Sequence, residues 1–217
     1  MNDVTEFARQ RTVSTISVQQ VIAAEWIWHE RTLAEWSADL ANLNLLIDAQ
    51  AGVNADLTGK RAELDGALED LRQQTVAYLA TARIRFRNDP IKMGVLRLLS
   101  AKANSRADVG EQALMWELAW TAMDAAWQPR PGVTLAGFRA QRLALGPTNE
   151  AFRTALISER IASGTLDAAT ETLTDHAEAW YADATTLFGS ETVTGDLVRS
   201  QVPTTYQPKR TPVKPGP

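Results

Sequence analysis

The two histidines of the chain both lie near acidic residues, as histidines in metal sites often do. Glu25 and His29 are four residues apart, which places them on one face of a helix, and Asp175 and Glu178 flank His176. Helical di-metal proteins hold their ions with two Glu-x-x-His pairs and two further glutamates. This chain has one Glu-x-x-x-His pair and no such pair at His176. The sequence therefore favours hydrogen-bonded histidines in a core, and Glu25, His29 and His176 stay as candidate ligands for the alternative of a metal-binding enzyme.

A second feature is a cluster of basic residues that contains a single acid, Asp89. Its seven cations are Arg83, Arg85, Arg87, Lys92, Arg97, Lys102 and Arg106. Like charges so close together repel one another unless an anion neutralises them. Cations at the end of a helix complement its dipole, but this does not account for Arg97 or Lys102. We expect residues 83–106 to meet solvent or an acidic protein surface, such as residues 63–70 of a neighbouring copy. Nucleic acid is disfavoured because only Phe86 is near for base stacking.

The C-terminal residues form a third candidate site. Lys209, Arg210, Pro212 and Pro215 fit a basic, proline-containing ligand for an aromatic groove on another protein. Such a match arises easily, because five of the last fifteen residues are proline. The composition predicts a flexible or docking terminus.

The seven tryptophans are the fourth feature. Six of them fall on apolar stripes beside alanines, and large side chains opposite small ones pack well between helices. Core packing is the favoured interpretation, and a subunit interface or a membrane-surface face are the alternatives. The six are Trp26, Trp36, Trp116, Trp120, Trp127 and Trp180.

No other pattern predicts chemistry. The sequence has no glycine-rich phosphate loop, no G-x-S-x-G elbow, no H-E-x-x-H and no calcium loop. It also has no cysteine, which excludes disulfides and cysteine-ligated metal centres. We therefore expect no cofactor and no catalytic residue.

The elements that must position these residues are helices. Apolar residues recur at alternating steps of four and three from Ile22 to Ile47 and again from Leu57 to Ala82, which is the pattern of long bundle helices or coiled coils. The two stretches share one heptad phase, so a single helix over residues 17–88, roughly 108 Å long, is one prediction. A turn at residues 52–59 is the favoured one, because this segment combines two glycines with Asn, Asp and Thr.

The remaining elements complete an all-α prediction. A third long helix begins at Asp89-Pro90 and ends near Trp127, with a kink or interruption at residues 100–110. Together these three antiparallel helices form a bundle over residues 17–127. Three shorter helices, each stopped by glycine, occupy residues 134–189 and pack on it. Polar residues 1–16 form an extended arm, and residues 190–217 form an extended proline-rich tail.

Composition sets the outer limits. With 45% hydrophobic and 22% charged residues, the chain has the composition of a soluble domain, and its net charge of -4 gives no general attraction for nucleic acid. No apolar stretch is long enough to span a membrane. The first twenty residues lack the apolar core of a signal peptide, so a cytoplasmic location is expected, with signal-independent secretion or a virion location as alternatives.

These observations predict a protein whose role is structural. Long matched helices, segregated charge and the absence of an active-site pattern favour a scaffold subunit that forms homo-oligomers through helix faces and termini, in a filament, a particle or a phage-like structure. A partner protein that binds the C-terminal tail is a further expectation. The alternatives are a helical ligand-binding or metal-binding enzyme, and an adaptor that binds an anionic partner through residues 83–106.

Overall fold

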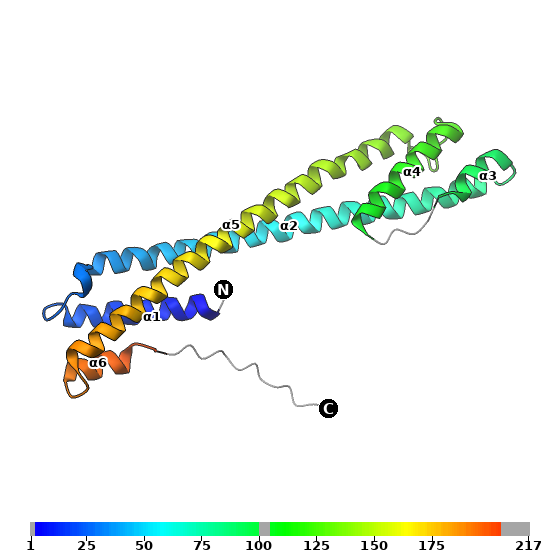
Figure 1. Cartoon of the computed structure of the whole chain (residues 1–217). Helices are drawn as coiled ribbons and strands as arrows, with labels where there is room; N and C mark the ends of the chain where they lie inside the picture. The colour runs from blue at the N-terminus through cyan, green and yellow to red at the C-terminus, as the bar shows by residue number, and fades with distance from the viewer. Residues whose placement is uncertain (1–2, 100–104, 205–217) are drawn as a thin grey trace, which may run out of the picture. The chain divides into compact units, whose positions relative to one another are not determined.

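The computed structural model describes residues 3–99 and 105–204, and in these residues the secondary structure is entirely helical (Figure 1). The all-α prediction is confirmed. The elements are α1 (Asp3–Ile22), the short 3-10 helix η1 (Trp28–Glu30), α2 (Leu33–Arg85), α3 (Pro90–Arg97), α4 (Arg106–Asp124), α5 (Leu135–Phe188) and α6 (Val193–Gln201). None of the described helices is long and apolar enough to cross a membrane.

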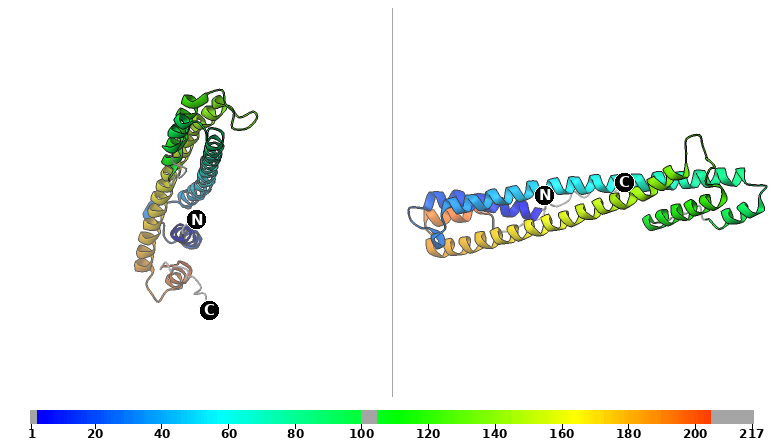
Figure 2. Two further views of the ribbon diagram at one scale, coloured as in Figure 1. Left: turned by 90° about the vertical axis from the view of Figure 1, so that its right-hand side faces the viewer. Right: turned by 90° about the horizontal axis from the view of Figure 1, so that it is seen from above.

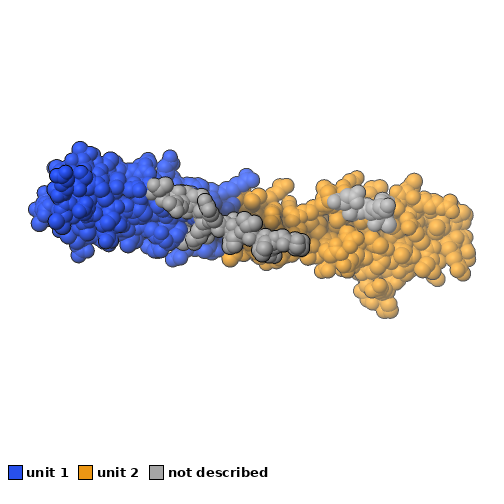
Figure 3. Space-filling model, turned by 90° about the horizontal axis from the view of Figure 1, so that it is seen from below, with its two compact units in different colours: residues 1–54, 158–217 blue, residues 55–157 orange. Residues whose placement is uncertain are grey.

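The chain divides into two compact units (Figure 3). Unit 1 comprises residues 1–54 and 158–217, and unit 2 comprises residues 55–157. The two longest helices, α2 and α5, each contribute one part to unit 1 and one part to unit 2. Within each unit, the part from α2 packs antiparallel to the part from α5.

Unit 1 is built from α1, the first part of α2, the last part of α5, and α6. Figures 1 and 2 show α1 beside α2 in this unit, and α1 also contacts α6. Its main core is formed by Val18, Ile22, Trp28, Trp36, Trp180, Ala184, Val198 and Val202. A smaller cluster of Leu43, Leu166 and Leu173 joins α2 to α5.

Unit 2 is built from the last part of α2, from α3 and α4, and from the first part of α5. Aromatic rings fill its centre: Tyr78 lies edge-on to Trp120 and to Phe138, with ring centroids 6.1 and 6.2 Å apart. Leucines of α2 and α3 surround these rings, among them Leu71, Leu79 and Leu96, which are at most 2% exposed.

The predicted turn at residues 52–59 is wrong, because α2 continues through them without a break. A glycine inside a helix costs about 1 kcal/mol relative to alanine. The buried leucines on either side, Leu43 and Leu64, belong to one continuous heptad phase. Packing of that seam outweighs the two glycines, so the weak local preference for a turn loses to tertiary structure.

This helix makes a testable prediction about Gly52 and Gly59. A Cβ added at either position meets nothing within 4 Å, so Gly52→Ala and Gly59→Ala should each stabilise the protein by about 0.5–1 kcal/mol. Gly189→Ala is the control, because Gly189 has a φ of 63° and its replacement should destabilise. Urea midpoints of the three variants measure the effect. Destabilisation by Gly52→Ala or Gly59→Ala would contradict a continuous helix at these positions and favour the turn predicted from the sequence.

The predicted extended arm at residues 1–16 is also wrong, since these residues belong to α1 from Asp3 onward. The buried face of α1 carries Thr5, Thr12, Thr15 and Gln19 beside Ala8 and Val18, which hides its helical periodicity. Where the sequence predicted a helix from Ser17 to beyond Ile47, α1 ends at Ile22 and α2 begins at Leu33.

The second half of the chain differs from expectation in continuity. The predicted stops at Gly146-Pro147 and Gly164 are wrong, because α5 runs through both. Pro147 lacks the N–H that an inner helical turn uses, but Leu145 and Phe152 on either side pack against the core of unit 2. Residues 193–201, predicted as extended tail, form α6, which Thr192 caps through the backbone N–H of Gly195 at 2.9 Å. Residues 205–217 lie outside the described residues.

Several helix ends follow the prediction. Asp89 caps α3 by accepting hydrogen bonds from the backbone N–H groups of Ile91 and Lys92, with Pro90 in the first turn. Gly189, with its positive φ, follows the last residue of α5. In place of a third long helix to Trp127 there are α3 and α4, and a capping box between Ser105 and Asp108 starts α4.

Candidate functional site

The segment between α1 and α2 contains the most unusual backbone of unit 1. His29 and Glu30 have φ angles of 49° and 58°, and no other described non-glycine residue has a positive φ. Such conformations cost of order 1–3 kcal/mol each and are concentrated at functional sites. We refer to residues 28–31 as the histidine turn.

Asp183 of α5 holds one side of the histidine turn. Its Oδ2 accepts a hydrogen bond from Trp28 Nε1 at 2.7 Å and lies 3.3 Å from His29 Nε2. The His29 side chain remains 71% exposed, whereas Trp28 is buried. Trp28 therefore occupies the core position that periodicity assigned to His29.

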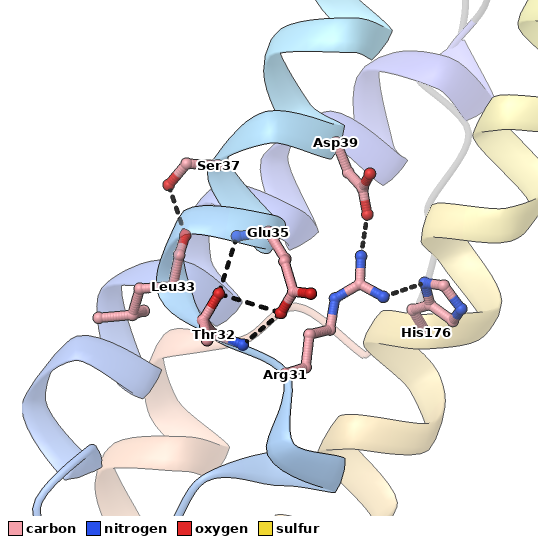
Figure 4. A network of polar contacts seen from close by, with 7 residues as sticks. All are labelled: Arg31, Thr32, Leu33, Glu35, Ser37, Asp39 and His176. Carbon is pink, nitrogen blue, oxygen red and sulfur yellow. Dashed lines mark hydrogen bonds and ion pairs between the residues drawn. The ribbon is translucent and has the colours of Figure 1, made fainter.

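Arg31 holds the other side of the turn and contacts the second histidine (Figure 4). One amino group of Arg31 lies 3.1 Å from His176 Nδ1, another donates to Asp39, and the guanidinium stacks over the Trp36 ring at 4.5 Å. Because arginine has only donors, His176 Nδ1 must accept, and the imidazole is neutral with its proton on Nε2. Burial lowers the pKa of His176, and the positive charge of Arg31 lowers it further.

A cap at the start of α2 fixes the position of one carboxylate near this site. Thr32 donates from its backbone N–H and its hydroxyl to Glu35 Oε2, at 2.7 and 3.0 Å, and the Glu35 N–H donates back to the Thr32 hydroxyl (Figure 4). The backbone N–H and the hydroxyl of Thr32 hold the pKa of Glu35 below its usual value. Glu35 is therefore ionised at neutral pH.

These side chains line an open cavity of about 630 Å³. Its walls are Trp28, His29, Glu30, Arg31, Glu35, Asp39 and His176. The cavity combines carboxylates, a guanidinium and a neutral imidazole, but Arg31 occupies His176 Nδ1, the nitrogen that a general base would use.

The three candidate metal ligands do not converge. His29 faces Asp183, His176 faces Arg31, and Glu25 lies 3.5 Å from the Thr194 hydroxyl. Within the described residues, no group of three or more His, Asp or Glu side chains is arranged to hold a metal ion.

A pH experiment tests the neutral state of His176. Folding lowers the pKa of His176, so the neutral side chain contributes its full stabilisation above the unfolded pKa of about 6.5. This stabilisation is lost as the pH falls from there through the lower pKa of the folded state. The free energy of unfolding should therefore fall between pH 7 and 5, and His176→Gln should reduce this fall. Urea titrations at several pH values measure it. His29→Gln is the matched control, and an equal effect of both variants contradicts the assignment.

In unit 2, the structure divides the predicted basic cluster into two groups. Arg83 donates to the carbonyls of Leu96 and Leu99 at 3.3 and 3.2 Å and so caps the end of α3. Lys92 pairs with Asp89 at 3.7 Å and lies over the Phe86 ring. Lys102 lies outside the described residues.

Arg106 pairs with Asp65 of the same chain, at 2.5 Å. From the sequence, the acids of residues 63–70, Asp65 among them, are expected to meet the basic cluster of a neighbouring copy. Arg85, Arg87 and Arg97 are exposed and make no ion pair with the described residues. These three are the cations left for a partner.

The tryptophans lie mainly inside the units. Trp36, Trp116, Trp120 and Trp180 are at most 1% exposed, which leaves them no surface to offer a second subunit. Trp26 and Trp127 are half-buried against the same cores. The predicted docking residues of the tail, Lys209, Arg210, Pro212 and Pro215, lie outside the described residues.

Two buried charges escaped the sequence analysis. Glu117 of α4 is 4% exposed and accepts from Arg139 Nε and Arg142 Nε of α5, at 2.6 and 2.7 Å. Arg11 of α1 is 3% exposed and pairs with Glu178 of α5 at 2.9 Å. The available signal for Glu117 was its spacing, since it follows Ala113 by four residues and precedes Trp120 by three on the apolar stripe.

No protein family model matches this chain, and the comparisons with curated proteins and with solved structures find no match.

Proposed function

We propose that this protein is a structural subunit that self-associates through helix faces into a multi-copy assembly. The observation that carries the proposal is an apolar face on α4 of unit 2. Leu114, Met115 and Leu118 lie within four residues of one another and are 38%, 47% and 56% exposed. Contiguous exposed apolar side chains at this spacing are typical of helix surfaces that pack on another helix.

A cavity adjoins this face, so the surface there is hollowed. It measures about 270 Å³, and Leu79, Leu98, Met115 and Trp116 contribute apolar side chains to its wall. Leu98, which is 84% exposed, extends the apolar surface from α4 to the end of α3. A face that carries both protruding leucines and a hollow is suited to pair with its own copy about a two-fold axis, where each subunit supplies the same patch.

Sedimentation of the purified protein over a range of concentrations tests the proposal. The wild type should form dimers or larger species, and the variant Met115→Glu/Leu118→Glu should shift the equilibrium to monomer by at least tenfold. Leu45→Glu, at a leucine that is 68% exposed on α2, is the matched control and should leave the equilibrium unchanged. A wild type that is monomeric at every concentration would end the self-association proposal.

A further inference from the structure

Most of the exposed residues between the end of α2 and the end of α3 are apolar or cationic, and the polar exception is Asn88. Figures 1 and 2 show the chain turning from α2 into α3 at one end of unit 2. Around this turn Ile84 is 71% exposed and Ile91 is 82% exposed, and Arg85, Arg87 and Arg97 are exposed among them. We call these five residues the basic tip.

No acid offsets the charge of the basic tip from within its own segment. Asp89 is the one carboxylate in residues 84–98, and it is engaged three times, by the backbone N–H groups of Ile91 and Lys92 and by the Lys92 ammonium. The chain as a whole has a net charge of -4, so the positive potential at the tip is local. Such a surface attracts anions only where it faces them.

We propose that the basic tip docks on the surface of an anionic lipid bilayer. Protruding aliphatic side chains beside arginines satisfy both parts of such an interface, because isoleucines enter the boundary of the acyl chains while arginines contact the headgroups. Nucleic acid is a poorer fit, since the aromatic ring of the segment, Phe86, is 8% exposed and covered by Lys92. An acidic protein would satisfy the arginines but would also have to provide apolar hollows for two isoleucines that protrude from different helices.

Vesicle co-sedimentation tests this surface with the full-length protein. It should bind vesicles of equal parts phosphatidylcholine and phosphatidylglycerol and should not bind vesicles of phosphatidylcholine alone. It should dissociate from the anionic vesicles as the salt concentration increases. Arg85→Gln/Arg87→Gln/Arg97→Gln should weaken binding by roughly 100-fold, at about fivefold per arginine. Ile84→Ser/Ile91→Ser should weaken binding without changing its dependence on salt.

The control carries the same change of net charge elsewhere. Arg61, Arg153 and Arg160 are exposed and make no ion pair with described residues, so their triple replacement by Gln should leave vesicle binding intact. Equal losses in both triple variants would reduce the effect to net charge and overturn the proposal. The absence of vesicle binding would also overturn the proposal. This includes the outcome in which the tip binds polyglutamate, an acidic polypeptide, but does not bind vesicles. None of these variants alters the apolar face of α4, so sedimentation of the same samples reports on self-association separately.

Discussion

Removing both arginines that contact Glu117, in the variant Arg139→Gln/Arg142→Gln, is expected to lower the free energy of unfolding by about 3 kcal/mol at neutral pH. The Glu117 side chain is 6% exposed, and the two Nε–H groups at 2.6 and 2.7 Å are its charged partners. Without them a carboxylate stays buried and uncompensated. The loss lies at the lower end of the range for broken buried pairs, because Arg139 is half exposed in the native protein.

The sign of the pH dependence separates this account from a simple loss of contacts. In the wild type, burial raises the pKa of Glu117, but hydrogen bonds from Arg142 and Arg139 outweigh burial and bring the pKa below its usual value. Glu117 therefore stabilises the fold above an unfolded pKa of about 4.3, and this contribution is lost as pH falls. In the double variant burial acts alone and raises the pKa, so the variant loses stability as pH rises. The difference between the two proteins should widen from pH 4 to 7 in urea titrations.

A triple variant provides the control. Adding Glu117→Gln to Arg139→Gln/Arg142→Gln removes the buried charge and should recover most of the lost stability at pH 7, because a neutral amide costs less to bury than an unpaired carboxylate. A triple variant no more stable than the double would show that the arginines act by packing.

The class of the fold was predictable because heptad spacing is a strong signal over long stretches, and the helix start at Asp89 was predictable because a local side chain makes the cap. The continuity of α5 was not, and for α2 the sequence offered both a continuous helix and the turn that was favoured. Gly52, Gly59 and Pro147 each have an unfavourable local preference, and only the leucines and aromatic residues that pack on either side of them decide the outcome. Such packing joins residues far apart in sequence, which a local pattern does not contain.

The histidine turn shows the same limit at a site. The spacing of Glu25 and His29 predicted one helix face, but this segment leaves the helix, and its positive φ angles turn Trp28 inward and His29 outward. The contact between Arg31 and His176 joins residues 145 positions apart. By contrast, the unusual density of cations at residues 83–106 was visible in the sequence, and the structure adds which of them are engaged.

The buried tryptophan of α5 in unit 1 should be the other position of large effect. Trp180 is fully buried, and its Nε1 donates to Gln19 Oε1 of α1 at 2.6 Å. Gln19 in turn donates to the Trp26 carbonyl at 2.7 Å, so the indole anchors both α1 and the start of the segment that leads to the histidine turn. Trp180→Ala should lower the free energy of unfolding by about 3–5 kcal/mol, through lost burial and the cavity that remains.

Trp180→Phe separates packing from hydrogen bonding. It keeps most of the apolar volume but leaves Gln19 Oε1 buried without its donor, which should cost about 1–3 kcal/mol. Adding Gln19→Leu should then recover only part of this loss, because it removes the unpaired Oε1 but also takes the donor from the Trp26 carbonyl. Leu187→Ala on the same helix, where the leucine is 57% exposed, should change stability by less than about 0.5 kcal/mol. If Trp180→Ala is no more costly than Leu187→Ala, Trp180 does not hold α1 against α5, and the packing of unit 1 described here is wrong.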